Sequence, residues 1–293
     1  MSSKLYDTLT AGQCRQAEAL YHLVMQKAAP PWGLCLALPE PGERLSDSFY
    51  GLSFSEGRLA SFLSVFCPDG NVAEISGFTH PSLRRRGHFS ALLEPALKRL
   101  KCRFGSPEVV YQCLTREPDA EAFIKAKGLS FLRGECLMEA ERTGASHGAE
   151  TETGPEAEGL AKTAVSFRAA GTAERPLLLS LHKKAFGEFP EGFIDTVLSD
   201  QDSLSRVILA DGEPAGLFHL TKSGGALFYL CGFGILPGFR GQGLAKAALS
   251  RILADCPAGG RLFLQVSTEN APAFSLYQSM GFLTVNRQDY YGL

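Results

Sequence analysis

The sequence predicts an α/β protein that contains two copies of one domain. Stretches of strand length alternate with amphipathic helices along most of the chain. One order of elements occurs twice, and a segment with almost no aliphatic residues separates the two occurrences near the midpoint. A chain of 293 residues is also long for one domain and comfortable for two.

Composition is that of an ordinary globular protein, with 45% hydrophobic and 20% charged residues and a net charge of −2 at pH 7. This balance gives no global basic field for nucleic acid. No apolar run approaches the ~20 residues of a membrane span, and the start of the chain has no apolar signal-peptide core. We therefore expect a cytoplasmic protein with neither nucleic acid nor membrane as a partner. The eight Cys form no C-x-x-C pair, which favours reduced thiols over disulfides or a metal site.

The first half begins with an amphipathic helix within residues 1–30, which Thr10 can cap. A Pro- and Gly-rich connection with a possible short strand follows up to residue 47. Turn signals and apolar runs then predict strands at 49–55, 58–66 and 71–79, the first two joined by a hairpin at Glu56-Gly57. Apolar residues at i, i+3 and i+4 predict a helix from about Arg84 to Arg103. Strand 108–114, helix 118–127 and strand 129–138 complete this half.

Residues 141–162 are small, acidic and Gly-rich, which is the composition of a linker. The predicted domains are therefore 1–140 and 163–293. The second half repeats the order of elements. We expect strands at 165–169, 205–210, 214–221, 226–235, 261–266 and 282–291, and helices at 174–186, 190–199, 240–254 and 271–279.

An internal duplication accounts for this order. Pro81 and Pro237, Arg84 and Arg240, and Gly87 and Gly243 are each 156 positions apart, and Gly128 and Gly281 are 153 apart. The repeat period is a whole domain, which excludes a solenoid of short repeats.

The most informative stretch is 228–249, an apolar strand, a short Pro/Gly connection and a helix that opens with Arg240-Gly241-Gln242-Gly243-Leu244-Ala245. Small residues at a helix start let a ligand approach free N–H groups and the positive end of the helix dipole. Such a site suits a phosphate or pyrophosphate. The pattern Arg-x-x-Gly-x-Ala after a strand resembles the acyl-CoA-binding signature of the GCN5-related N-acetyltransferases (GNAT).

The sequence also resembles a second signature block of the same family, in the run Asn270-x-x-Ala-x-x-Leu-Tyr277-x-x-x-Gly281-Phe282. Taken alone, these residues make a capped helix: Asn270 is a good N-cap, and Gly281 suits the C-terminal end. A lone Tyr277 would be an ordinary half-buried side chain. Together with the Gly-rich helix start, it favours the functional interpretation.

The resemblance implies two tandem GNAT-like domains, each a mixed, mostly antiparallel sheet flanked by helices and splayed between its fourth and fifth strands. It implies that backbone N–H groups of Phe233, Gly234, Ile235 and Leu236 hold the thioester and pantetheine of acetyl-CoA, and that Arg240 to Ala245 hold the pyrophosphate. It places Asn270 and Tyr277 at the thioester, with Tyr277 as the acid for the departing thiolate. The expected activity is direct acetyl transfer to a primary amine of a small-molecule or peptide acceptor, with no metal and no covalent enzyme intermediate.

The general base departs from the family's commonest pattern, a Glu on the fourth strand, because residues 226–236 contain no carboxylate. Candidates elsewhere are Glu188, Glu191, His219, Glu269 and Asp289, although solvated or capping roles fit each of them as well. A water chain, or an amine that arrives neutral, would also serve.

The N-terminal copy is degenerate. It has Phe89 where the signature has Gly or Ala, and counting back from Gly128 places Ile124 at the position of Tyr277 and Glu117 at that of Asn270. Glu74 is a possible base without an acid partner. We therefore expect chemistry only in the C-terminal half.

The same motifs admit two alternative functions. A non-catalytic acyl-CoA-binding or interaction protein on the same fold stays open, since a fold does not fix a function. A dinucleotide site at Gly241-x-Gly243 lacks the context of that motif, because no acidic residue ends the next strand.

Overall fold

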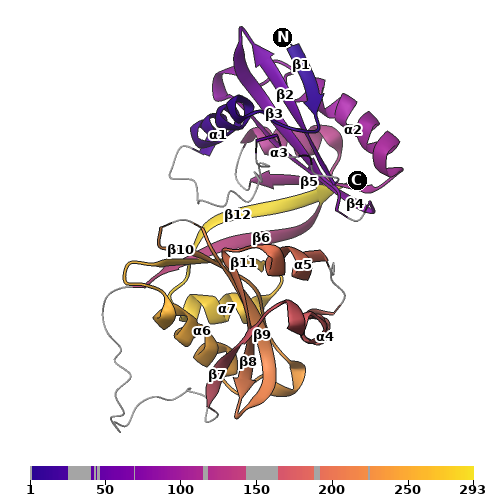
Figure 1. Ribbon diagram of the computed structural model, residues 1–293. Helices are drawn as coiled ribbons and strands as arrows, with labels where there is room; N and C mark the ends of the chain where they lie inside the picture. Colours follow the sequence, from indigo (N-terminus) through magenta and orange to yellow (C-terminus); the bar gives the residue numbers. More distant parts are fainter. Residues whose placement is uncertain are drawn as a thin grey trace. The chain divides into compact units, whose positions relative to one another are not determined.

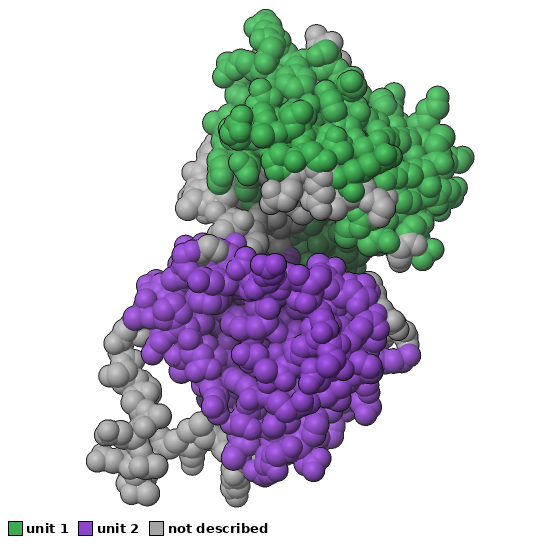
Figure 2. Space-filling view, in the orientation of Figure 1, with its two compact units in different colours: residues 1–135, 287–293 green, residues 136–286 purple. Residues whose placement is uncertain are grey.

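The computed structural model describes residues 2–25, 41–42, 44, 47–68, 70–114, 118–142, 164–187, 192–223 and 225–293. The chain forms two compact units, one of residues 1–135 with 287–293 and one of residues 136–286 (Figure 2). The predicted short strand within 28–47 and most of the predicted linker lie outside the described residues. No described helix is long and apolar enough to cross a bilayer.

Unit 1 holds an open sheet in the order β1-β2-β3-β4-β5-β12, antiparallel except for the parallel pair β4–β5 (Figure 1). Its elements are β1 (Ser2–Tyr6), α1 (Ala11–Met25), β2 (Ser48–Ser55), β3 (Arg58–Phe66), β4 (Val72–Thr79), α2 (Ser90–Phe104), β5 (Glu108–Leu114), α3 (Pro118–Lys127) and the first part of β6 (Ser130–Glu141). The strand β1 was not predicted.

The alternation of side chains along the strands builds a core on each face of this sheet. Phe49 and Leu63 pack under α2, whereas Tyr50 and Phe62, their chain neighbours, pack under α1. The predicted cap of α1 is confirmed as a reciprocal pair: the Gln13 N–H donates to Thr10 Oγ1 (3.3 Å), and the Thr10 N–H donates to Gln13 Oε1 (2.8 Å).

Unit 2 repeats this architecture, with strand order β6-β11-β10-β9-β8-β7 and a parallel pair β10–β11. Its elements are β7 (Val165–Ala170), α4 (Arg175–Phe186), α5 (Gly192–Ser199), β8 (Ser203–Ala210), β9 (Glu213–Lys222), β10 (Leu227–Ile235), α6 (Leu244–Asp255), β11 (Arg261–Ser267), α7 (Ala271–Ser279) and the first part of β12 (Leu283–Gly292).

The two faces of the second sheet are covered by different helices, α6 with α7 on one and α4 with α5 on the other (Figure 1), and each face has its own core. On one face, Leu244 and Leu249 of α6 pack with Tyr277 of α7. On the other face, Leu178 of α4 and Ile194 of α5 pack against β8 and β9. The mixed, mostly antiparallel α/β fold expected for each half is thereby confirmed.

The compact units do not coincide with halves of the sequence. The last residues of β12, 287–293, belong to unit 1, and the last residues of β6, from Cys136 onward, belong to unit 2. The division into 1–140, 141–162 and 163–293 stays a prediction about the repeat in the sequence.

Candidate active site

In unit 2, the sheet opens beside β10. The parallel pairing of β10 with β11 ends at Leu230, opposite Leu264, while β10 continues to Ile235. A bulge between Cys231 and Gly234 interrupts the pairing of β10 with β9 on its other side. The last part of β10 therefore has one edge without a strand partner among the described residues, as expected for a splay between the fourth and fifth strands.

The backbone of this open edge carries hydrogen-bond donors. The Leu236 N–H donates to Ala215 O of β9 (2.8 Å), and Gly234 is paired with Leu217 of the same strand. Because the N–H groups of successive strand residues point to opposite sides, those of Phe233 and Ile235 face the splay. Two of the four predicted residues thus present their N–H groups to the opening, and the other two are turned toward β9.

The connection after β10 is a 3₁₀ turn, Pro237–Phe239, followed by left-handed glycines at Gly241 (φ 74°) and Gly243 (φ 77°). The first helical N–H with a carbonyl partner is that of Ala247, which donates to Gly243 O (3.0 Å). The N–H groups ahead of it, at the start of α6, precede the hydrogen-bond ladder of the helix. This arrangement suits an anion.

Arg240 donates hydrogen bonds to three backbone carbonyls. Its Nε donates to Ile235 O (2.9 Å), its Nη2 donates to Ala185 O of α4 (2.8 Å), and its N–H donates to Pro237 O (3.2 Å). The side chain therefore ties the connection to β10 and α4. Gln242 is engaged similarly, since its Nε2 donates to Gly238 O (3.2 Å).

The last two residues of the motif, Leu244 and Ala245, differ in burial. Leu244 is a core residue and Ala245 is half-buried, so the helix presents a small side chain beside its free N–H groups.

Asn270 is the N-cap of α7, where its Oδ1 accepts the Ala273 N–H (3.2 Å). Its side chain is exposed. The ring of Tyr277 is buried against Phe282, and burial raises the pKa of its hydroxyl to about 12. The phenol is therefore protonated at neutral pH, the state that an acid requires.

The residues predicted as candidate general bases lie in different parts of the chain. Glu188 and Glu191 lie outside the described residues, and Glu269 is exposed. Asp289 belongs to unit 1, where it accepts a hydrogen bond from Arg287 (3.0 Å) and pairs with Cys113 across the strands. Burial raises the pKa of the Cys231 thiol of β10 to about 12, which disfavours the thiolate form that a nucleophile requires.

His219 is fully buried in β9, next to a residue that was not singled out from the sequence. His182 of α4 is 4% exposed, and its Nε2 lies 3.2 Å from His219 Nε2. Ser205 Oγ lies 2.7 Å from His219 Nδ1. Only the tertiary structure brings these three residues together, from α4, β8 and β9.

Unit 1 contains the same local geometry. The pairing of β4 with β5 ends at Ile75, opposite Tyr111, while β4 continues to Thr79. Gly87 (φ 82°) takes the place of Gly243, and Arg85 adopts the left-handed φ of 61° that Gly241 has in unit 2. Arg84 repeats the tie of Arg240 by donating from Nε to Thr79 O (3.3 Å).

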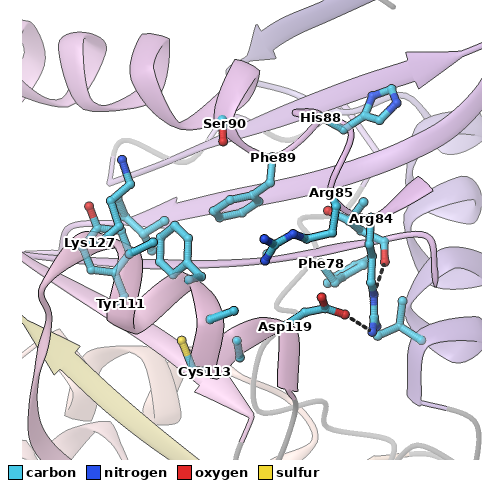
Figure 3. Close-up of a pocket in the computed structure, with 18 of the residues that line it drawn as sticks. Phe78, Arg84, Arg85, His88, Phe89, Ser90, Tyr111, Cys113, Asp119 and Lys127 are labelled. Atoms are coloured by element: carbon cyan, nitrogen blue, oxygen red, sulfur yellow. Dashed lines mark hydrogen bonds and ion pairs between the residues drawn. The ribbon is translucent and has the colours of Figure 1, made fainter. Parts of the chain in front are cut away.

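A cavity of about 460 Å³ lies at the opened sheet of unit 1 (Figure 3). Arg85 extends into it, and Arg84 is held at its border by an ion pair with Asp119 (2.9 Å). Lys127 also lines it, opposite an apolar wall that includes Phe78. Its lining therefore combines positive charge with aromatic surface.

The ring of Phe89 stands inside this opening. A Cβ at Gly77 would meet Phe89 Cε2 at 2.7 Å, and Phe89 packs edge-on against Phe123 with centroids 5.6 Å apart. The ring thus lies between the end of β4 and α3. In unit 2 the corresponding residue is Ala245, whose side chain is a single methyl group.

Comparison with known proteins identifies the family of the chain. Residues 175–282 match the model of the acetyltransferase (GNAT) family. A mycothiol acetyltransferase of Kineococcus radiotolerans is 30% identical over 249 residues, which cover 78% of this chain and 75% of the relative. The chain belongs to the GNAT family. It is accordingly an acyltransferase.

Solved GNAT structures share the fold over the whole chain. A GCN5-related N-acetyltransferase from Sphaerobacter thermophilus superposes with a TM-score of 0.74 at 13% identity, covering 99% of this chain and 94% of its own. A tandem GNAT protein from the clavulanic acid biosynthesis pathway superposes with a TM-score of 0.69 at 16% identity, covering 100% and 98%. The tandem arrangement of this GNAT protein therefore has a solved counterpart.

Proposed function

We propose that this GNAT protein transfers the acetyl group of acetyl-CoA directly to a primary amine and that the reaction takes place in unit 2. The observation that carries the proposal is the coincidence, in one unit, of an open β10 edge, a helix start with free N–H groups and a protonated, buried Tyr277. Acyl transfer needs these three functions: carbonyl stabilisation, anion binding and a proton donor.

The residues of unit 2 fit acetyl-CoA, which supplies an activated acetyl thioester. The N–H groups of Phe233 and Ile235 face the splay and would bind the thioester carbonyl and the pantetheine amides. The N–H groups from Gly241 to Ala245 would bind the pyrophosphate, with Arg240 positioning their backbone through its three hydrogen bonds. Tyr277 would donate its proton to the departing thiolate.

Unit 1 lacks part of this set. Ile124 stands at the position of Tyr277, so the phenol of that motif position is missing in unit 1. Phe89 places an aromatic ring beside the open strand, where unit 2 has the methyl group of Ala245. The cavity of unit 1 supports ligand binding, whereas a proton donor supports placing the chemistry in unit 2.

The acceptor is tested with a panel. A mycothiol-type amine belongs in it because of the 30% identical relative, together with small amines and peptide N-termini. The assay follows CoA thiol release from acetyl-CoA. We expect amine-dependent release by the wild-type protein, and binding of acetyl-CoA without release for any amine would favour the non-catalytic alternative.

Three variants test the assigned roles. Tyr277→Phe should lower kcat by about 10²–10⁴-fold with little change in acetyl-CoA affinity, whereas Tyr6→Phe in unit 1 is the matched control and should be unaffected. Asn270→Asp keeps the helix cap but removes the amide N–H groups. Loss of activity in Asn270→Asp would assign the amide a role at the thioester, and loss in Asn270→Ala alone would assign only the cap. An unchanged kcat in Tyr277→Phe across pH 6–9 would exclude the phenol as the acid.

A further inference from the structure

A buried chain of three polar side chains runs beneath the bulge of β10. Ser205 Oγ, both nitrogens of His219 and Nε2 of His182 are linked by contacts of 2.7 and 3.2 Å. The two imidazole rings are stacked with their centroids 5.3 Å apart and their planes 19° apart. Both residues are at most 4% exposed.

This chain contacts the strand at the point where the pairing of β10 is interrupted. A Cβ at Gly232 would lie 2.7 Å from His219 Cδ2 and 2.8 Å from His182 Nε2. Gly232 has φ 55° and lies between Cys231 and Gly234, the two ends of the bulge. The histidines are thus pressed against the segment whose N–H groups face the splay.

The histidine pair and Tyr277 lie on opposite faces of the unit 2 sheet. Tyr277 and α6 cover one face of the unit 2 sheet, and α4 with α5 covers the other. His182 lies on α4, so the proposed acid and the histidine pair approach β10 from opposite faces. In a direct transfer, the attacking nitrogen loses one proton and the leaving sulfur gains another, at different places. A base and an acid on opposite faces of the sheet allow these two separate transfers.

We propose that His182 is the proton acceptor for the attacking amine, and that His219 and Ser205 are positioning residues that fix its tautomer. The proposal rests on the proposed function and deepens it by supplying the base that β10 lacks. The proton would reach His182 directly or through one water.

The bonds and protons of the proposed reaction balance. A bond forms between the amine nitrogen and the acetyl carbon, and the carbon–sulfur bond breaks. The nitrogen gives one proton to His182, and the thiolate takes one from Tyr277. Tyr277 is then reprotonated from solvent, and His182 returns its proton there, so no co-reactant is required.

The required tautomer is one of the two that these contacts allow. If Ser205 Oγ accepts from His219 Nδ1–H, then His219 Nε2 carries a lone pair and accepts from His182 Nε2–H. Nδ1 of His182 is then the basic atom of the ring. When it takes a proton, the positive charge is stabilised by the Nε2–H bond to His219.

The surroundings keep both rings neutral before the reaction. Burial lowers the pKa of His182 to about 4, and burial together with the neighbouring His182 lowers that of His219 to about 4. Phe186 and Phe193 pack around the pair, with centroids 4.9 and 5.5 Å from His182. A neutral imidazole is the form that can accept a proton.

The test compares His182→Gln, Ser205→Ala and the surface control His22→Gln in the full chain, with acetyl-CoA and the best amine of the panel. We expect His182→Gln to lower kcat by about 10²–10⁴-fold, Ser205→Ala by about tenfold and His22→Gln not at all. Acetyl-CoA affinity, measured by calorimetry, should change less than about threefold in all of them, since the pair faces away from α6. Imidazole added to His182→Ala should restore part of the lost rate.

Each outcome of this test either supports or overturns the role of His182. If His182→Gln retains kcat within about threefold of wild type, the proposal is overturned and the pair is a structural core element. The same conclusion follows if imidazole restores nothing in folded His182→Ala and activity tracks the folded fraction. A wild-type protein that releases no CoA overturns the function in unit 2 and the role of His182 together. Normal affinity with lost turnover and imidazole rescue supports the role of His182.

Discussion

Replacing Gly232 by Ala should destabilise unit 2 more than the same change at Gly241 or Gly238. The left-handed φ of 55° costs a residue with a Cβ about 1–2 kcal/mol. The new methyl would also meet His219 Cδ2 at 2.7 Å and His182 Nε2 at 2.8 Å, and overpacking of a buried site adds about 1–3 kcal/mol. The rings cannot move aside easily, because they are stacked on each other and both pack edge-on against Phe193. The sum is about 2–5 kcal/mol.

Two glycines of the same unit are matched controls. Gly241 has φ 74° but nothing within 4 Å of a built Cβ, so Gly241→Ala should cost only about 1–2 kcal/mol. Gly238 has open space and no positive φ, so Gly238→Ala should be neutral or slightly stabilising.

The assay is thermal unfolding followed by calorimetry. At roughly 2–4 °C per kcal/mol for a unit of this size, we expect Gly232→Ala to lower the Tm by about 4–20 °C and Gly241→Ala by about 2–8 °C. If Gly232→Ala lowers the Tm no more than Gly241→Ala, the close packing of the histidine pair on the bulge is refuted.

Three further predictions concern other parts of the chain. Thr10→Ala removes the side-chain acceptor of the α1 cap and should cost about 1 kcal/mol in a urea titration, whereas an unchanged midpoint would show that the Thr10–Gln13 pair contributes nothing. Arg240→Ala breaks two bonds to carbonyls and should raise the Kd for acetyl-CoA by about 5–100-fold in calorimetry; equal affinity would remove Arg240 from the positioning of the α6 start. The pH dependence of stability follows from the buried histidines: their folded pKa of about 4 lies below the ordinary 6.5, so the unfolded chain binds more protons between these values. The contribution of the two histidines to the free energy of unfolding is then fully present above pH 6.5. It falls toward pH 4 by up to about 1.4 kcal/mol per pH unit for each histidine. In a pH series of urea titrations, the free energy of unfolding of His182→Gln should therefore change less steeply with pH than that of wild type.

Most elements of the fold were predictable because they depend on local pattern. The strand Arg58–Phe66 and the helix Ala271–Ser279 have the predicted bounds, since hairpin turns, caps and apolar periodicity are encoded in neighbouring residues. The helices after the Gly-rich connections begin later than predicted, at Ser90 and Leu244 rather than 84 and 240. Left-handed residues at Arg85 and Gly241 hold the chain out of the helix there, and nothing in the apolar periodicity signals this.

Parts of the site were predictable for the same reason. Asn270, Tyr277 and the run from Gly241 to Ala245 lie within short motifs, so their spacing alone places them on a helix start and a helix face. The side-chain contacts of Arg240 were not predictable, since its partners Ile235 and Ala185 are a strand end and a helix end. Those contacts depend on packing.

The sequence by itself determined the family, the repeat and the two motifs, because each is written in residues that are close along the chain. Only the tertiary structure decided which N–H groups of β10 face the opening, because this depends on the register with β9 and on where the pairing with β11 stops. It also decided the neighbours of His219. His182 lies 37 residues away, and only the packing of α4 on the sheet places the two rings together beneath Gly232. Local patterns carry no record of such contacts, because they arise when separate elements are buried against one another.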